Sequence, residues 1–283
     1  MRTRVPVIFA CAAVFVDSAA MAQPVFSDNF ETAPDPSPLS WQAQQDNASL
    51  RTDSDPANTV GVAFTALAGQ WFHRNKAGTP IHDIQVTNLA PPGGAGGSSN
   101  YLRIHRGGGA DTGIDAAFQD WNAGLNSGVV TMEWDMFIPT GQTGFVGGFY
   151  VTQYLDNDHS NGTSGSLATF FFRADGSIRQ SFGGFNNNPD LPGVAATPGQ
   201  WQHYVLVNDL TAQTYTLSID GTTSAAFGYN FPLIPGAGAR GFTFNGQEGK
   251  EYYVDNVSIV IPEPASLGLL AVTSLFVAAR RRR

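Results

Sequence analysis

The stretch Thr214-Tyr215-Thr216-Leu217-Ser218-Ile219-Asp220-Gly221 alternates hydroxyl-bearing and apolar side chains and then ends in Asp-Gly. Successive side chains of a β-strand point to opposite faces of the sheet, so Tyr215, Leu217 and Ile219 would share one buried face. Asp-Gly is a preferred sequence for the two-residue turn of a β-hairpin. The stretch therefore predicts a half-buried strand that turns directly into another strand.

Similar strand signals recur on both sides of this stretch, and Asp175-Gly176 marks a second hairpin. Most of the signals are rich in β-branched and aromatic residues and are bounded by Gly, Pro, Asn or Asp. No window of about 11 residues within residues 23–261 has a convincing helical periodicity. The sequence therefore predicts an all-β fold, a two-sheet antiparallel sandwich. The expected strands are 25–30, 60–66, 81–88, 101–106, 129–138, 149–154, 168–173, 177–182, 202–208, 215–219, 242–244 and 252–261.

The composition fits a folded β protein and excludes several classes. With 42% hydrophobic and 13% charged residues among 283, the chain is neither disordered nor a coiled coil. A formal net charge of -8 argues against nucleic acid as a partner, because counterion release needs a basic surface. The single cysteine, Cys11, excludes an internal disulfide framework and a thiolate metal cluster.

Three segments of the chain resemble the concanavalin A-like, laminin-G-like jelly roll: 199–205 with its Gly-Gln-Trp-Gln-His-Tyr-Val, 215–221, and the closing 252–259. In that family a Trp opens one strand, the next strand ends in Asp-Gly, and a final strand returns beside the first. Residues 26–31 look like the matching opening strand. The resemblance implies a jelly-roll sandwich, a fold that serves lectins, glycosidases, lyases and inert modules alike.

The N-terminus has the three parts of a secretory signal peptide. Arg2 and Arg4 precede an apolar run over 5–16, and small residues stand before the expected cleavage between Ala22 and Gln23. A buried N-terminal helix is the alternative interpretation. Cleavage would remove Cys11 with the signal.

The C-terminus also has three parts: Pro262-Glu263-Pro264, an apolar run over 265–279, and the cluster Arg280, Arg281, Arg282 and Arg283. The fifteen apolar residues would reach about 22 Å as a helix, which is short of the roughly 30 Å hydrocarbon core of a membrane. Arginines at both ends of the chain favour the cytoplasmic side, so the segment between them would cross the membrane outward.

This tripartite end resembles the PEP-CTERM sorting signal of Gram-negative bacteria. In that family an exosortase recognises the tail in the inner membrane and is thought to process it near Pro-Glu-Pro. The cargo is delivered to the cell envelope or the exterior, often alongside exopolysaccharide production. The resemblance implies the exosortase and the secretion machinery as partners, with transient insertion of the C-terminal helix into the inner membrane. A plain tail anchor is the alternative.

The chain therefore divides into a signal peptide (1–22), one β-sandwich domain (23–261) and a sorting signal with a short hydrophobic helix (262–283). The central segment has 9 Lys and Arg against 21 Asp and Glu, a net charge of -12. We find no internal repeat, and no linker long enough to divide the central segment.

The strand over 131–138 carries the most suggestive polar pair. Glu133 and Asp135 would share one face, opposite Met132, Trp134, Met136 and Ile138. Concanavalin A-like glucanases carry a Glu-x-Asp-x-(x)-Glu strand in their cleft, and this chain has Phe137 or Ile138 where the second Glu would stand. Glycoside hydrolysis needs two carboxyl groups, so the departure favours binding over cleavage. A solvated polar face is the default alternative.

Aromatic side chains that could stack on a sugar ring complete the predicted site. Trp71 and Trp121 have polar neighbours and are expected to be exposed, whereas Trp134 and Trp201 are expected in the core. The predicted ligand-binding set is Trp71, Trp121, Glu133, Asp135, Tyr150 and Arg173, with the site on the face of Glu133 and Asp135, beside Arg173 and aromatic walls.

Calcium is the one cofactor that the residues suggest, through Asp156 and Asp158 in the loop 156–162. Alternating oxygen ligands suit calcium, but Asn161 stands where an EF-hand needs its turn glycine, so a plain surface loop is the alternative. The five histidines lack a zinc-binding spacing.

Three functions follow for the exported domain. The first is a non-catalytic protein that binds polysaccharide, or sits within exopolysaccharide, at the cell envelope or outside the cell. The second is a glycoside hydrolase or polysaccharide lyase whose carboxylates come from separate strands. The third is a purely structural or adhesive surface protein.

Overall fold

The computed structural model describes residues 24–28, 71–74, 82–87, 101–106, 116–153, 166–180, 189–229, 231–233 and 238–261. These residues belong to one compact unit and form fifteen strands and no helix. The strands are β1 (Pro24–Asp28), β2 (Trp71–Arg74), β3 (His82–Thr87), β4 (Tyr101–Arg106), β5 (Ala116–Leu125), β6 (Val129–Phe137), β7 (Phe145–Thr152), β8 (Ser166–Arg173), β9 (Ile178–Gln180), β10 (Trp201–Asp209), β11 (Thr214–Ile219), β12 (Thr222–Thr223), β13 (Phe227–Gly228), β14 (Ala239–Gly246) and β15 (Lys250–Val260).

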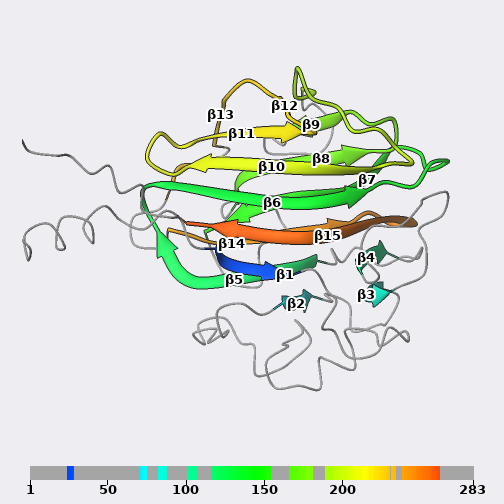
Figure 1. Ribbon diagram of the computed structural model, residues 1–283, viewed down its shortest axis with the longest axis horizontal. Helices are drawn as coiled ribbons and strands as arrows, with labels where there is room; N and C mark the ends of the chain where they lie inside the picture. Colours follow the sequence, from blue (N-terminus) through cyan, green and yellow to red (C-terminus); the bar gives the residue numbers. More distant parts are fainter. Residues whose placement is uncertain are drawn as a thin grey trace, which may run out of the picture. The chain divides into compact units, whose positions relative to one another are not determined.

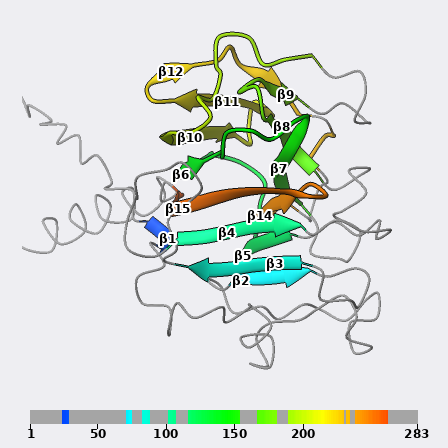
Figure 2. The same ribbon diagram turned by 90° about the vertical axis from the view of Figure 1, so that its right-hand side faces the viewer.

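The strands pair into two antiparallel sheets (Figures 1 and 2). A nine-stranded sheet has the order β12-β11-β10-β6-β15-β4-β3, with β1 also on β15 and β13 also on β11. A six-stranded sheet has the order β2-β5-β14-β7-β8-β9. The predicted all-β, two-sheet antiparallel jelly-roll sandwich is confirmed.

Both predicted Asp-Gly hairpins are confirmed. Asp175-Gly176 joins β8 to β9, and Asp220-Gly221 joins β11 to β12. Asp220 and Gly221 have φ angles of 47° and 81°, and positive φ at both central residues is what the tight hairpin turn requires. The expected strand over 60–66 lies outside the described residues, whereas β2 and β5 were not predicted.

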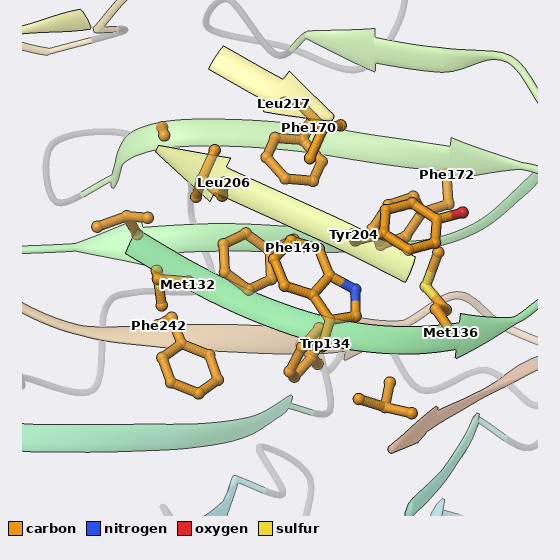
Figure 3. Packing of buried hydrophobic residues seen from close by; sticks show 14 of the residues in the cluster. Met132, Trp134, Met136, Phe149, Phe170, Phe172, Tyr204, Leu206, Leu217 and Phe242 are labelled. Carbon is orange, nitrogen blue, oxygen red and sulfur yellow. The ribbon is translucent and has the colours of Figure 1, made fainter. Parts of the chain in front are cut away.

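The main core lies between the sheets and is built by strict alternation. In β6 the side chains of Met132, Trp134 and Met136 are buried, and the residues between them are not fully buried. The Trp134 ring stacks on Phe149 of β7 with centroids 4.7 Å apart and on Tyr204 of β10 at 5.5 Å (Figure 3). Aromatic rings from both sheets therefore close the sandwich, which confirms Trp134 as a core residue.

Candidate functional site

Because Met132, Trp134 and Met136 fill the core, the residues between them face outward from the nine-stranded sheet. The side chains of Glu133 and Asp135 are 40% and 29% exposed. The predicted shared face of this pair is therefore confirmed, and it is the outer face of the sheet.

The neighbouring strand β10 adds a histidine to this face. The register places His203 directly opposite Asp135, and the His203 side chain is 48% exposed. His203 Nδ1 lies 2.8 Å from Asp135 Oδ1, and His203 Nε2 lies 3.9 Å from Glu133 Oε2. A carboxylate only accepts hydrogen bonds, so the Nδ1–H of His203 donates a hydrogen bond to Asp135 Oδ1. This arrangement leaves Nε2 facing Glu133 and solvent.

A β-bulge supplies a fourth polar side chain from the strand on the other side of β6. The β15–β6 register shifts between Asp255 and Ser258, and Asn256 has a φ of 49°. Bulges re-aim side chains, and here the Asn256 amide donates to Asp135 Oδ2 at 2.7 Å. Glu133, Asp135, His203 and Asn256 together form what we call the His203 cluster.

The backbone of the cluster is tied to the Asp220 turn. The carboxylate of Asp220 accepts a hydrogen bond from His203 N at 2.9 Å and another from Gln202 Nε2 at 2.9 Å. These contacts fix the start of β10 against the turn after β11. The His203 cluster therefore rests on three paired strands rather than on a loop, which favours a defined geometry.

An aromatic cluster borders the His203 cluster on the same outer face. Tyr101, Phe137 and Tyr253 are buried there. Trp201 packs against them, and its side chain is half-buried. The Trp201 ring lies 5.7 Å from both Tyr101 and Phe137. Burial raises the pKa of Tyr101 to about 12. Trp201 was expected in the core, and it lies instead in this smaller outer cluster because odd-numbered positions of β10 face outward.

Two predicted site residues do not share this face. Tyr150 lies in β7 and Arg173 in β8, both strands of the six-stranded sheet. Tyr150 is buried, its hydroxyl accepts a hydrogen bond from Asn245 at 3.1 Å, and burial raises its pKa. The expectation that Arg173 flanks Glu133 and Asp135 is wrong, because the strand signals do not reveal which sheet a strand joins.

Several predicted residues cannot be placed in a site. Trp71 and Trp121 belong to β2 and β5, but the positions of their side chains lie outside the described part. Asp156, Asp158, the cleavage position Ala22–Gln23 and the sorting signal, with Pro262, Glu263, Pro264 and Arg280 to Arg283, also lie outside it. The domain boundaries therefore stay predictions.

No group of three or more His, Cys, Asp or Glu side chains suited to a metal is found in the part of the chain that the structure describes. The calcium site stays a prediction, since its aspartates lie outside that part. Within the same described ranges, no helix is long and apolar enough to span a membrane.

Sequence reasoning missed His203 and Asn256 as site residues. His203 lies two positions after Trp201, so alternation places the two on one face of β10. Its contact with Asp135 depends on the pairing of β10 with β6, which alternation does not reveal. Asn256 reaches the site only through the bulge, which no pattern in the sequence marks.

The C-terminal residues 260–283 match the PEP-CTERM protein-sorting motif. This match confirms that the tail resembles a PEP-CTERM sorting signal. The motif implies recognition by an exosortase during export to the cell envelope or the exterior. The match covers the tail alone and leaves the chemistry of the sandwich open. No curated protein matches the chain in sequence.

Several solved structures are similar to the chain at low sequence identity. The conserved carbohydrate esterase of the Shiga toxin-encoding bacteriophage phi24B is 11% identical, with a TM-score of 0.52 over 86% of this chain and 100% of that one. A sialidase is 11% identical with a TM-score of 0.46 over 67% of this chain, which spans only 16% of the sialidase. The Caenorhabditis elegans galectin LEC-6 is 16% identical with a TM-score of 0.34, over 50% of this chain and 88% of the galectin. At 11% identity the likeness to the esterase concerns the fold alone.

Proposed function

We propose that the chain is an exported, non-catalytic protein of the cell envelope that binds a neutral polysaccharide through the His203 cluster. The observation that carries the proposal is the exposed, hydrogen-bonded set of Asp135, His203 and Asn256 beside the partly exposed ring of Trp201. Sugars offer hydroxyl pairs and an apolar ring face, and this surface has groups that complement both.

Each side chain has a defined role in this proposal. The Glu133 carboxylate and His203 Nε2 form hydrogen bonds with neighbouring hydroxyls of one sugar ring. Asp135 fixes the imidazole through Nδ1, as a positioning residue, and the exposed part of Trp201 contacts the C–H face of the sugar. The net charge of -12 over residues 23–261 favours a neutral polymer at this acidic face over an anionic one.

Binding without cleavage is supported by the residues that follow Asp135. Phe137 lies buried in the outer aromatic cluster and Ile138 lies in the main core, so neither position supplies the second carboxyl group that glycoside hydrolysis uses. The runner-up is a glycoside hydrolase or polysaccharide lyase that uses Glu133 and a carboxylate from a separate strand, favoured by the 40% exposure of the Glu133 side chain. Release of sugar products from a polysaccharide panel, abolished by Glu133→Gln, would establish the hydrolase instead.

The tail acts before the sandwich does in this proposal. The apolar run over 265–279 inserts into the inner membrane until the exosortase processes the chain near Pro262. A chain that lacks residues 262–283 should then cross the membrane but escape sorting. Cell fractionation should find this truncated chain in the soluble periplasm, and a distribution equal to that of the intact chain would contradict the proposed role.

Replacing His203 with alanine should lower the affinity for neutral polysaccharide by about tenfold or more relative to the wild type. The substitution removes at least one hydrogen bond to the sugar and leaves Asp135 without its imidazole partner. The affinity is measured on a panel of neutral glucans, xylans and mannans, with and without calcium. Thr216→Ala, on β11 of the same sheet, serves as the control and should bind as the wild type does. No binding to any member of the panel would leave only the structural or adhesive function.

A further inference from the structure

The sandwich runs into the sorting motif with no linker between them. The motif match begins at Val260, which is also the last residue of β15. The next residue, Ile261, is half-buried and packs against the main core. Only residues 262–264 then separate it from the apolar run over 265–279. The folded domain is therefore held close to whatever surrounds the tail.

Two turns extend past the point where the chain leaves the sheet. The strand β6 begins, and β10 and β15 end, at the same end of the nine-stranded sheet (Figure 1). The register pairs Val260 with Thr131, so β6 continues outward for about 7 Å to its first residue, Val129. The end of β10 is level with the start of β6. The turns beyond these strand ends, 126–128 and 211–213, form what we call the exit rim.

Hydrogen bonds hold the two turns of the exit rim together. Gly128 N donates to Thr211 Oγ1 at 2.9 Å, and Leu210 N donates to Gly128 O at 2.9 Å. Asp209 Oδ1 accepts hydrogen bonds from the amides of Thr211 and Ala212 at 2.9 Å and 2.8 Å. All residues of the exit rim are exposed and none is charged, although the domain has a net charge of -12. The exit rim is thus a fixed, uncharged surface.

The segment between the sheet and the apolar run is about as long as the exit rim needs to reach a membrane surface. Residues 261–264 span at most about 14 Å when fully extended. The headgroup layer on one side of a bilayer takes up roughly 5–7 Å of that length. The remainder, about 7–9 Å, is close to the extension of β6 past Val260. When the tail is inserted, the exit rim therefore touches the surface that the tail enters.

The N-terminal strand of the domain starts at the same end of the sheet. The strand β1 pairs antiparallel with β15, and Pro24 stands opposite Val260. The predicted signal peptide ends at Ala22, so both segments that are expected in the membrane leave the sandwich at this end. Two parts of the chain that are far apart in sequence thus agree on which end of the sandwich faces the membrane.

We propose that the exit rim is a docking surface for the exosortase, which acts on the tail while the sandwich is already folded. This inference rests on the proposed insertion and processing of the tail. During processing the enzyme surrounds the tail, so the surface within reach of residues 261–264 is the exported surface of the enzyme rather than lipid. An uncharged rim suits this contact, because a charge there would lose its hydration without gaining a partner.

Photo-crosslinking in exosortase-producing cells that make the full chain tests the contact directly. Benzoylphenylalanine replaces Ala212 in the exit rim. In the matched control it replaces Thr140, an exposed residue in the turn after β6 at the opposite end of the sheet. We expect irradiation to join the chain to the exosortase, identified by mass spectrometry, from position 212 only. Adducts with lipid alone from position 212, or equal exosortase adducts from both positions, would overturn the proposal.

Charge substitutions measure what the contact contributes to processing. The double variant Ser127→Glu/Ala212→Glu should slow processing of the tail about threefold or more in a pulse-chase experiment. The control Thr140→Glu/Thr222→Glu adds the same charges at the opposite end and should be processed at the wild-type rate. Six Gly and Ser residues inserted after Ile261 add about 20 Å of reach, so they should restore the rate of the first double variant. Failure to restore it would mean that the charges act on folding or export and not on docking.

The proposed role of the tail and the exit rim fail in different ways. If the wild-type tail is never processed, the role of the tail is wrong and the docking surface with it. If the wild-type tail is processed and the Ser127→Glu/Ala212→Glu variant is processed equally fast, only the docking surface is wrong.

Discussion

Replacing Trp134 with alanine should lower the free energy of unfolding by about 3–5 kcal/mol, the range for removing a large aromatic side chain from a packed core. The ring stacks between Phe149 at 4.7 Å and Tyr204 at 5.5 Å, and it meets Phe244 edge-on at 5.7 Å. Its indole nitrogen has no hydrogen-bond partner among the described residues, so the loss comes from packing. Urea unfolding followed by far-UV circular dichroism measures the change.

Val207 supplies the matched control on the adjacent strand β10. Its side chain faces outward and the residue is 36% exposed, so Val207→Ala should change the free energy of unfolding by no more than about 0.5 kcal/mol. If Trp134→Ala were as mild as Val207→Ala, the two sheets would not be joined by the aromatic core described here.

Replacing Gly176 with alanine should lower the free energy of unfolding by roughly 2–5 kcal/mol, through two separate effects. Gly176 has a φ of 86°, where a side chain is strained, and an added Cβ would lie 2.1 Å from the backbone oxygen of Ala196. The amide of Ala196 also donates a hydrogen bond to Gly176 O at 2.7 Å. Moving the two segments apart to admit a side chain would break this hydrogen bond.

The variant Gly221→Ala distinguishes the strain of a positive φ from the steric clash. Gly221 has nearly the same φ, 81°, but nothing lies within 4 Å of the position of an added Cβ. Gly221→Ala should therefore lower the free energy of unfolding only by the conformational strain, about 1–2 kcal/mol. Thermal melts of both variants measure the difference, and equal destabilisation would mean that the approach of Ala196 to Gly176 is not close in solution.

The strands that alternate clearly could be predicted from the sequence, and those with mixed composition could not. The segment 101–106 is bounded as predicted, and the alternation in β6 places Trp134 inside and Glu133 outside. The strand β5 has the sequence Ala-Ala-Phe-Gln-Asp-Trp-Asn-Ala-Gly-Leu, in which Ala, Asp, Asn and Gly all disfavour strands. Its pairing between β2 and β14 decides its structure, and that pairing is not visible in local composition.

The candidate site could be predicted only within a single strand. Alternation is a local property, so the shared face of Glu133 and Asp135 follows from the sequence. The contact between Asp135 and His203 spans 68 positions and depends on the register of β6 and β10. The separation of Tyr150 and Arg173 from this face likewise depends on sheet membership, which long-range pairing determines.

The most direct measurement of the central claim is side-chain NMR of the histidines, of which the chain has five, during titration with a fragment of the bound neutral polysaccharide. If the outer face of the nine-stranded sheet holds the glycan, the imidazole signals of His203 should shift in saturable fashion, and far more than those of the other histidines. An unchanged His203 signal at saturating ligand would place the glycan elsewhere and contradict the proposed site.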